Sequence, residues 1–310
     1  MAKTNRSVAV IGAGLSGISA AQVMVRKGHR VVVFEKSRGY GGRCATKRWD
    51  GHVVDHGVQY FTMRDPDFRQ AVSSACGADI SEISSPILTP SGEPLTAEDR
   101  FFHRAGNSRL VRALAEGLDV RTGVEVGPVV DKTVEGERFD VIVTTAPIPQ
   151  TCRLVGGEVP ASEYIPSLTL LLLYEGDPIG MSAARYAVSD RSGHPLAWSA
   201  CENHKPGRIL PGFTVFVVQA SESFSREWLE AAPTEWSEPL RKLVEERWAV
   251  PPSAFLSLHP HRWRFARVGS PLSVPELPEG WFFAGDALSE SRVESAWLAG
   301  RDVGLRVHSS

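Results

Sequence analysis

Residues 8–35 read VAVIGAGLSGISAAQVMVRKGHRVVVFE. The β-branched run at residues 8–11 is typical of a buried parallel strand, and glycines follow it at once. The residues after these glycines favour a helix that runs to about residue 27, with Gly28 where a C-terminal cap belongs. Residues 31–35 favour a second strand, which ends in an acid. The stretch therefore predicts a strand, a helix and a second strand parallel to the first.

The turn between the first strand and the helix has the pattern Gly-x-Gly-x-x-Gly. Its first glycine permits the tight turn, its second lets backbone N–H groups approach a pyrophosphate at the positive helix end, and its third allows close packing. Glu35 follows the last glycine by 18 residues, where a carboxylate accepts hydrogen bonds from both ribose hydroxyls and repels a 2′-phosphate. We therefore predict a dinucleotide site made by Glu35 and the turn residues Gly12, Ala13, Gly14, Leu15, Ser16 and Gly17.

The composition limits the classes of protein and partner. With 310 residues, 42% of them hydrophobic and 23% charged, the chain is long enough for two globular domains or one large α/β unit. A formal net charge of −2 gives no global attraction for nucleic acid or anionic lipid. The four cysteines form no Cys-x-x-Cys pair, so we expect no metal site, no disulfide framework and a reducing, cytoplasmic location. Glycines and polar residues interrupt the apolar residues 8–25, which argues against a membrane anchor.

The rest of the chain predicts two domains. Residues 118–126 and 139–147 favour further strands of the nucleotide domain, and residues 281–286 form an apolar strand ending in Gly-Asp before a helix at 293–307. Apolar strands at 168–174 and 214–219, with a helical stretch at 233–248, suggest an antiparallel sheet with helices beside it. We assign residues 1–64, 102–155 and 275–310 to the first domain, and residues 65–101 and 156–274 to the second.

Period two along residues 261–267 places His261, Trp263 and Phe265 on one face of a strand, and Arg262, Arg264 and Ala266 on the other. We expect the aromatic face to roof a cofactor or to belong to the sheet core.

With these anchors, the sequence resembles the renalases, a flavoprotein family within the amine-oxidase-like superfamily. The segments that carry the resemblance are residues 36–43 (KSRGYGGR), 55–62 (DHGVQYFT), 145–147 (TAP), 261–266 (HRWRFA) and 285–300, which begins with Gly-Asp. Two positions depart from the family: His56 stands where the family usually has a small or apolar residue, and Val58 stands where it usually has alanine. Residues 65–101 match the family poorly.

The resemblance implies an α/β fold: a Rossmann-type FAD-binding domain of the two-dinucleotide-binding-domain type, and a second α+β substrate domain on an antiparallel sheet. It implies that an aspartate after the last strand binds the ribityl chain and that the next helix points at the flavin pyrimidine. We expect non-covalent FAD, since no cysteine follows Cys201 to form a thioether with the ring, while a link through histidine stays open. Beyond the turn and Glu35, the implied cofactor contacts are Lys36, Arg38, Gly42, Arg43, Gln59, Tyr60, Val126, Ala146, Gly285, Asp286, Arg292, Val293, Glu294 and Ala296. The implied substrate contacts are Tyr60, His261, Trp263 and Phe265.

The activity that the resemblance implies is oxidation of 2- or 6-dihydro isomers of NAD(P)H, with hydride passing to flavin N5 and then on to dioxygen. Forming an aromatic pyridinium needs no proton removed from the substrate, and we find no Ser/His/Asp or paired-carboxylate constellation for acid–base catalysis. Two alternatives stay open. One is a flavin amine oxidase or desaturase, which the absence of lysine between residues 259 and 300 disfavours. The other is a non-catalytic flavin-binding protein.

Overall fold

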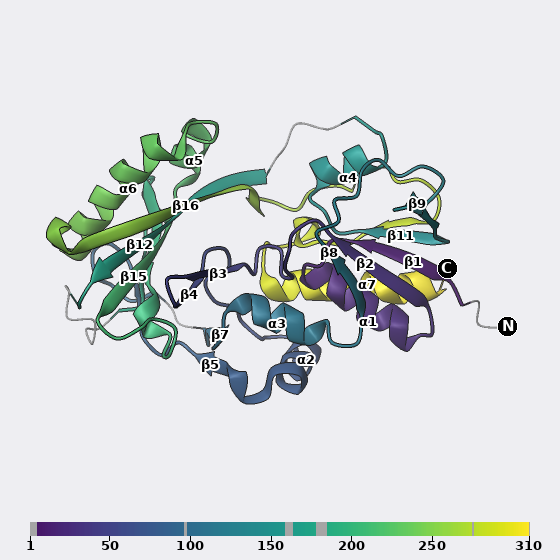
Figure 1. Ribbon diagram of the computed structural model, residues 1–310, viewed down its shortest axis with the longest axis horizontal. Coiled ribbons are helices and arrows are strands. Elements are labelled where there is room, and N and C mark those ends of the chain that lie inside the picture. The colour runs from purple at the N-terminus through teal and green to yellow at the C-terminus, as the bar shows by residue number, and fades with distance from the viewer. Residues whose placement is uncertain (1–4, 96–97, 159–163, 178–184, 275, 310) are drawn as a thin grey trace.

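The computed structural model describes residues 5–95, 98–158, 164–177, 185–274 and 276–309. It has two domains that lie side by side, and the first and last described residues belong to the same domain (Figure 1). The α/β class and the Rossmann-like first domain that the sequence predicts are confirmed.

The first domain is built on a five-stranded parallel sheet with the order β17-β11-β1-β2-β8. Along its central strand Val8 and Val10 face helices α1 and α7, whereas Ala9 and Ile11 face the side of α4, as period two requires. A Cβ at Gly300 would lie 2.0 Å from the Ser16 carbonyl oxygen, so α7 approaches α1 closely only because glycine stands there. The bounds are β1 Ser7–Ile11, α1 Leu15–Arg26, β2 Arg30–Glu35, β8 Asp119–Thr122, β9 Thr133–Val134, β10 Glu137–Arg138, β11 Val141–Thr144, α4 Ile148–Leu154, β17 Trp281–Phe283 and α7 Val293–Ser309.

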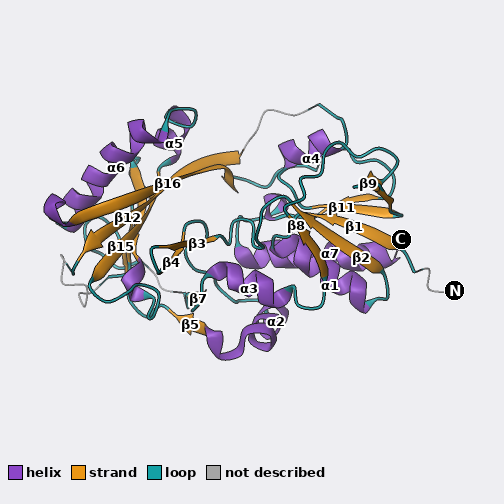
Figure 2. Cartoon of the chain, viewed as in Figure 1, coloured by secondary structure: helices purple, strands orange, loops and turns teal. Residues whose placement is uncertain are grey.

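The second domain is built on a six-stranded sheet with the order β16-β12-β15-β14-β13-β6. Its pairings are antiparallel except for β13 with β6. Leu168, Leu170 and Leu172 on one face pack against helix α6, and Leu171 on the other face packs against Val54 of a hairpin. Figure 2 shows α6 beside this sheet. The bounds are β6 Ile87–Leu88, β12 Tyr164–Glu175, β13 Ala187–Ser189, β14 Leu196–Cys201, β15 Phe213–Ala220, α5 Glu222–Glu227, α6 Pro233–Trp248 and β16 Phe255–Val268.

A layer of short elements joins the two sheets. It contains β3 Thr46–Trp49, β4 His52–Asp55, α2 Pro66–Cys76, β5 Ile80–Glu82, β7 Phe101–His103 and α3 Asn107–Leu114. Phe68 and Val72 of α2 pack into the core of the first domain, so the structure places residues 66–76 there, although our division of the chain gave residues 65–101 to the second domain. Four 3-10 helices complete the described elements, at Gly77–Asp79 (η1), Glu202–His204 (η2), Pro252–Ala254 (η3) and Asp286–Leu288 (η4).

Several strand boundaries differ from the sequence prediction. The strand expected at 118–126 ends at Thr122 because Gly123 has φ +74°, which leaves Val126 in a loop. The strands expected at 139–147 and 281–286 are shortened to β11 and β17.

The alternation expected along residues 261–267 holds as far as Arg264, because His261 and Trp263 contact His56 whereas Arg262 and Arg264 contact Ala231 and Glu230, and a bulge interrupts it beyond that point. The partner register shifts from Ser167 opposite Trp263 to Ile165 opposite Arg267, a bulge that ends period two.

Candidate active site

A cleft of about 1980 Å³ lies between the two domains, and side chains of both domains line it. It runs past the carboxyl ends of β1, β2, β11 and β17, the edge at which open α/β sheets bind ligands. The opposite wall comes from β12, β14, β15 and β16 of the second sheet.

Glu35 anchors the end of the cleft nearest the glycine turn. Its Oε2 accepts a hydrogen bond from the Ala13 backbone N–H at 2.9 Å, and its Oε1 accepts one from the Ser37 N–H at 2.8 Å. Each carboxylate oxygen has a second acceptor position, so the buried side chain can also accept from ribose hydroxyls.

The glycine turn has the shape that a pyrophosphate needs. Gly12 has φ +109°, and a Cβ on Gly17 would lie 1.9 Å from the Gly12 carbonyl oxygen, so both positions require glycine. No atom lies within 4 Å of where a Cβ on Gly14 would be, and a Cβ on Gly42 would lie 3.7 Å from the Gly14 Cα. The two glycine loops therefore approach each other closely at Gly14 and Gly42, beside open space at the start of α1, and the residues fit the diphosphate of FAD.

The C-terminal segment returns to the same cleft, as the sequence predicts. Both Asp286 oxygens accept hydrogen bonds from the Arg43 guanidinium, at 2.5 and 3.0 Å, and Arg43 also donates to the Ala266 carbonyl at 3.1 Å. Arg43 thus connects the loop at residues 36–43 with η4 and β16. It also orients the Asp286 carboxylate, which the resemblance assigns to the ribityl chain. Val293 and Ala296 at the start of α7 line the same wall.

The structure brings nearly all of the predicted site residues to this cleft. Those that line it are Gly12, Gly14, Leu15, Ser16, Glu35, Lys36, Arg38, Gly42, Arg43, Gln59, Tyr60, Val126, Ala146, His261, Trp263, Phe265, Gly285, Asp286, Arg292, Val293 and Ala296. Ala13, Gly17 and Glu294 do not line it. The first two shape the turn, whereas the Glu294 carboxylate accepts from the Asp65 backbone N–H at 2.6 Å and so holds the start of α2.

The far end of the cleft is aromatic, and part of it escaped the sequence analysis. Tyr60 lies 6.1 Å from Trp198 between ring centroids, and His56 lies 4.7 Å from His261 and stacks on Trp263 at 5.6 Å. All of these residues line the cleft. His56 carried a signal only as a departure from the family, and Trp198 carried none because its place depends on the pairing of β14 with β15.

The two histidines are neutral near pH 7. Burial lowers the pKa of His56 to about 3, with His261 adding to the effect, and burial together with His259 lowers the pKa of His261 to about 4. They can exchange hydrogen bonds with a ligand, but they supply no cation at neutral pH.

The charge of the cleft is strongly positive. Among the described residues that line it, twelve are lysine or arginine and five are aspartate or glutamate. Lys36 is the only lysine among them, and it follows Glu35 at the glycine-turn end. Because the whole chain is close to neutral, this excess is a property of the cleft and not of the composition.

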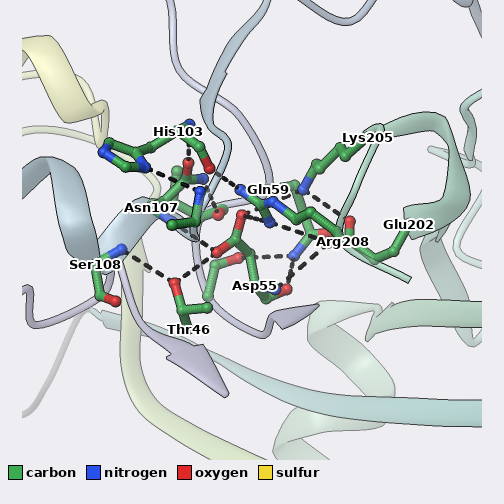
Figure 3. A network of polar contacts seen from close by, with 12 residues as sticks. Thr46, Asp55, Gln59, His103, Asn107, Ser108, Glu202, Lys205 and Arg208 are labelled. Carbon is green, nitrogen blue, oxygen red and sulfur yellow. Dashed lines mark hydrogen bonds and ion pairs between the residues drawn. The ribbon is translucent and has the colours of Figure 1, made fainter. Parts of the chain in front are cut away.

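A buried charged cluster surrounds Asp55, and Gln59 contacts it (Figure 3). Asp55 is fully buried and accepts from Thr46, from the Asn107 N–H at the start of α3, from Lys205 and from Arg208. Glu202 pairs with the same two cations, and the Gln59 amide donates to the Asp55 carbonyl at 2.6 Å. The cluster joins the two domains directly beneath residues 56–60.

Two features are absent from the part of the chain that the structure describes. It contains no helix long and apolar enough to cross a membrane. It also contains no group of three or more His, Cys, Asp or Glu side chains that could hold a metal ion.

Residues 10–75 match the family described as NAD(P)-binding Rossmann-like domain. A stretch of 75 residues, 24% of this chain, is 39% identical to the 4,4′-diapophytoene desaturase (4,4′-diaponeurosporene-forming) of Staphylococcus aureus strain Newman. That stretch spans only 14% of the length of the desaturase.

Solved structures match over nearly the whole chain. Cyclohexylamine oxidase from Brevibacterium oxydans IH-35A superposes with a TM-score of 0.73 at 12% identity, over 98% of this chain and 99% of that one. Putrescine oxidase bound to putrescine gives 0.71 at 14% identity, over 99% of each chain. Reduced UDP-galactopyranose mutase gives 0.76 at 10% identity, over 98% of this chain and 95% of that one. Because oxidases and a mutase share the architecture, the likeness shows the fold and leaves the reaction to be argued from the site.

Proposed function

We propose that this chain, which has the fold of the amine-oxidase-like flavoproteins, is an FAD-dependent oxidase of 2- and 6-dihydro isomers of NAD(P)H. In the overall reaction the dihydropyridine ring would give up a hydride, and dioxygen would accept the two electrons. With one proton from solvent, the products are NAD(P)⁺ and hydrogen peroxide.

The character of the aromatic end of the cleft carries this proposal. Tyr60, Trp198 and Trp263 offer flat walls to a planar ring, and the nearby His56 and His261 are neutral. The only lysine that lines the described cleft lies at the opposite end. A reaction that ends in an aromatic pyridinium takes no proton from carbon, so positioning suffices for it.

The charge of the cleft supports the same substrate class. Twelve basic against five acidic lining residues attract a nucleotide that carries phosphate groups. The same field repels the ammonium form of an amine. This difference separates the proposal from the amine-oxidase alternative, for which the fold alone is equally suitable.

The residues of this chain bind and orient the reactants. FAD, when bound, supplies the ring that accepts the hydride. Glu35 and the facing glycine loops would hold its adenosine and diphosphate, and Asp286, oriented by Arg43, would hold the ribityl chain. Tyr60 and Phe265 would keep the dihydropyridine flat against the flavin, and Trp198 would close the cavity to water.

Anaerobic rapid mixing tests the proposal. The purified yellow protein is mixed with the 2- and 6-dihydro isomers, and in parallel with putrescine and cyclohexylamine, while flavin absorbance is followed. We expect the isomers to bleach the flavin and the amines to leave it oxidised, with peroxide formed once air is admitted. Bleaching by an amine alone would favour the amine-oxidase alternative over the proposed function. No bleaching by any compound would favour a non-catalytic flavoprotein.

A further inference from the structure

Three charged side chains meet at the solvent-facing rim of the aromatic end of the cleft. Arg64 donates through Nε to Glu98 Oε2 at 3.1 Å, and its Nη2 contacts Glu98 Oε1, so one guanidinium holds both carboxylate oxygens. Arg292 Nη2 lies 3.9 Å from the same Oε2 atom. All three residues line the cleft. A single anionic oxygen thus already lies between two guanidinium groups.

The second arginine is fixed in place from within the protein. Arg292 donates to the Thr62 hydroxyl at 2.7 Å, two residues beyond Tyr60 in the chain. Its other contact is Glu290, whose side chain is 78% exposed, at 3.3 Å. Arg292 is therefore held beside the aromatic walls, and the carboxylates that neutralise the rim, Glu98 and Glu290, are exposed.

The field at Tyr60 agrees with this arrangement. Burial raises the pKa of its phenol, and the negative charge of Glu98 adds to this rise. The positive charges of Arg100, Arg292 and Arg191 lower the same pKa. Four charged groups therefore lie within electrostatic reach of the substrate wall, and three of them are cations.

We propose that Arg64 and Arg292 form a subsite for a phosphate group of the substrate, and that the Glu98 carboxylate occupies this subsite until a phosphate displaces it. The proposal rests on the proposed function and names the part of the substrate that the rim binds. Guanidinium groups match phosphate oxygens in a forked geometry, and the diphosphate of a dinucleotide carries two negative charges, whereas a carboxylate carries one. The exchange costs little because Arg64 and Glu98 are 53% and 51% exposed, and exposed ion pairs contribute little.

Substitutions of the two partners in this ion pair should change substrate binding in opposite directions. A merely structural role would not produce this difference. Arg64→Gln removes the phosphate partner, so binding of phosphate-bearing substrates weakens. Glu98→Gln removes the competitor and the repulsion, so their binding tightens. If the pair only stabilised the rim, both variants would shift binding in the same direction.

The kinetic test uses a graded series: the dihydro isomers as riboside without phosphate, as 5′-mononucleotide, as dinucleotide and as dinucleotide 2′-phosphate. The apparent Kd from anaerobic flavin reduction is measured for each. For Arg64→Gln, we expect the ratio of the dinucleotide Kd to the riboside Kd to rise about five- to twentyfold, and for Glu98→Gln to fall several-fold. The member of the series at which the effect first appears identifies which phosphate binds.

The control is Arg30→Gln, because Arg30 is also 53% exposed and pairs with Glu137 but lies outside the cleft. Its Kd ratio should match that of the wild type. Equal ratios in all variants, or a shift of Arg64→Gln and Glu98→Gln in the same direction, overturn the subsite.

A binding experiment separates this subsite from the proposed function. The FAD-loaded protein is titrated with inorganic pyrophosphate in a calorimeter, without turnover. Weaker binding in Arg64→Gln with tighter binding in Glu98→Gln supports the subsite even if no dihydropyridine reduces the flavin, in which case the proposed function alone fails. If the isomers reduce the flavin while neither substitution changes the affinity for pyrophosphate, the subsite alone fails.

Discussion

Glu35 shows how one side chain can serve the fold and the site together. It receives the Ala13 and Ser37 backbone N–H groups, and so it closes the glycine turn and begins the loop that follows β2. Its remaining acceptor positions are those that we assign to the ribose of FAD.

Glu35→Ala should therefore weaken FAD retention by about 1.5–3 kcal/mol, because charge-assisted hydrogen bonds are lost. Equilibrium dialysis with flavin fluorescence measures the change in Kd. The exposed Glu116→Ala serves as a control and should retain FAD like the wild type. Full occupancy of Glu35→Ala at low FAD would contradict the assignment.

His56 gives a second prediction at the residue scale, through its pKa of about 3 in the folded protein. In the unfolded chain a histidine titrates near pH 6.5, so below that pH the unfolded state binds more protons and stability falls as the pH falls. From pH 7 to pH 5 we expect His56 to account for about 1–2 kcal/mol of the loss in the free energy of unfolding.

Urea unfolding of the wild type and His56→Ala at both pH values measures this contribution. Other buried histidines add to the total loss, so the informative quantity is the difference between the two proteins. The variant should lose less stability than the wild type on acidification. An identical loss in both would show that His56 titrates normally.

At the scale of elements, strand β16 determines how the aromatic wall is built. His261 and Trp263 precede the bulge, and Trp263 Nε1 donates to the His56 carbonyl at 2.9 Å across the domain boundary. Phe265 lies within the bulge, lines the cleft and packs edge-on against Tyr164 at 5.3 Å. Alternation thus brings His261 and Trp263 to the cavity, and Phe265 reaches it from within the bulge.

Phe265→Ala should slow anaerobic flavin reduction by roughly tenfold to a hundredfold, about 1.4–2.7 kcal/mol of barrier, because the dihydropyridine loses a positioning wall. Stopped-flow absorbance with the dihydro isomers gives the rate, and the flavin spectrum reports cofactor content. Phe224→Ala, on the helical side of the second sheet, is the matched control. Loss of FAD from Phe265→Ala, or an unchanged rate, would count against a positioning role.

At the scale of the whole molecule, fully buried ion pairs join the two domains. Burial favours the neutral form of Asp55, but Arg208 and Lys205 outweigh it and hold the pKa of this carboxyl below its usual value. Two carboxylates face two cations in the cluster, so it is balanced only when all four are present.

Asp55→Asn should lower the free energy of unfolding by about 3–5 kcal/mol, because it leaves a buried cation without a counter-charge. The double variant Asp55→Asn with Lys205→Met restores the balance and should recover part of this loss. Asp119→Asn, in the exposed pair with Arg121, should change stability by less than about 1 kcal/mol. Urea unfolding measures all of these variants, and additive effects of Asp55→Asn and Lys205→Met would argue against the balanced cluster.

The sequence by itself determined the parts of the protein that depend on local order. The glycine turn, the helix behind it and Glu35 lie within 28 residues, and their spacing alone carries the geometry of a dinucleotide site. Helix α7 buries one face along its length, whereas strand β12 of the second sheet is buried on both faces and appears in the sequence as an apolar run.

The tertiary structure alone decided the groupings that depend on contacts distant in sequence. Asp55 meets Arg208 across 153 positions, Arg64 meets Glu98 across 34, and the ring contact of His56 with His261 depends on how the two domains dock. No local period encodes such pairs, because side chains come together there only after sheets, bulges and domains have packed. The bulge in β16 is the clearest case, since a shift in register broke an alternation that the residues themselves support.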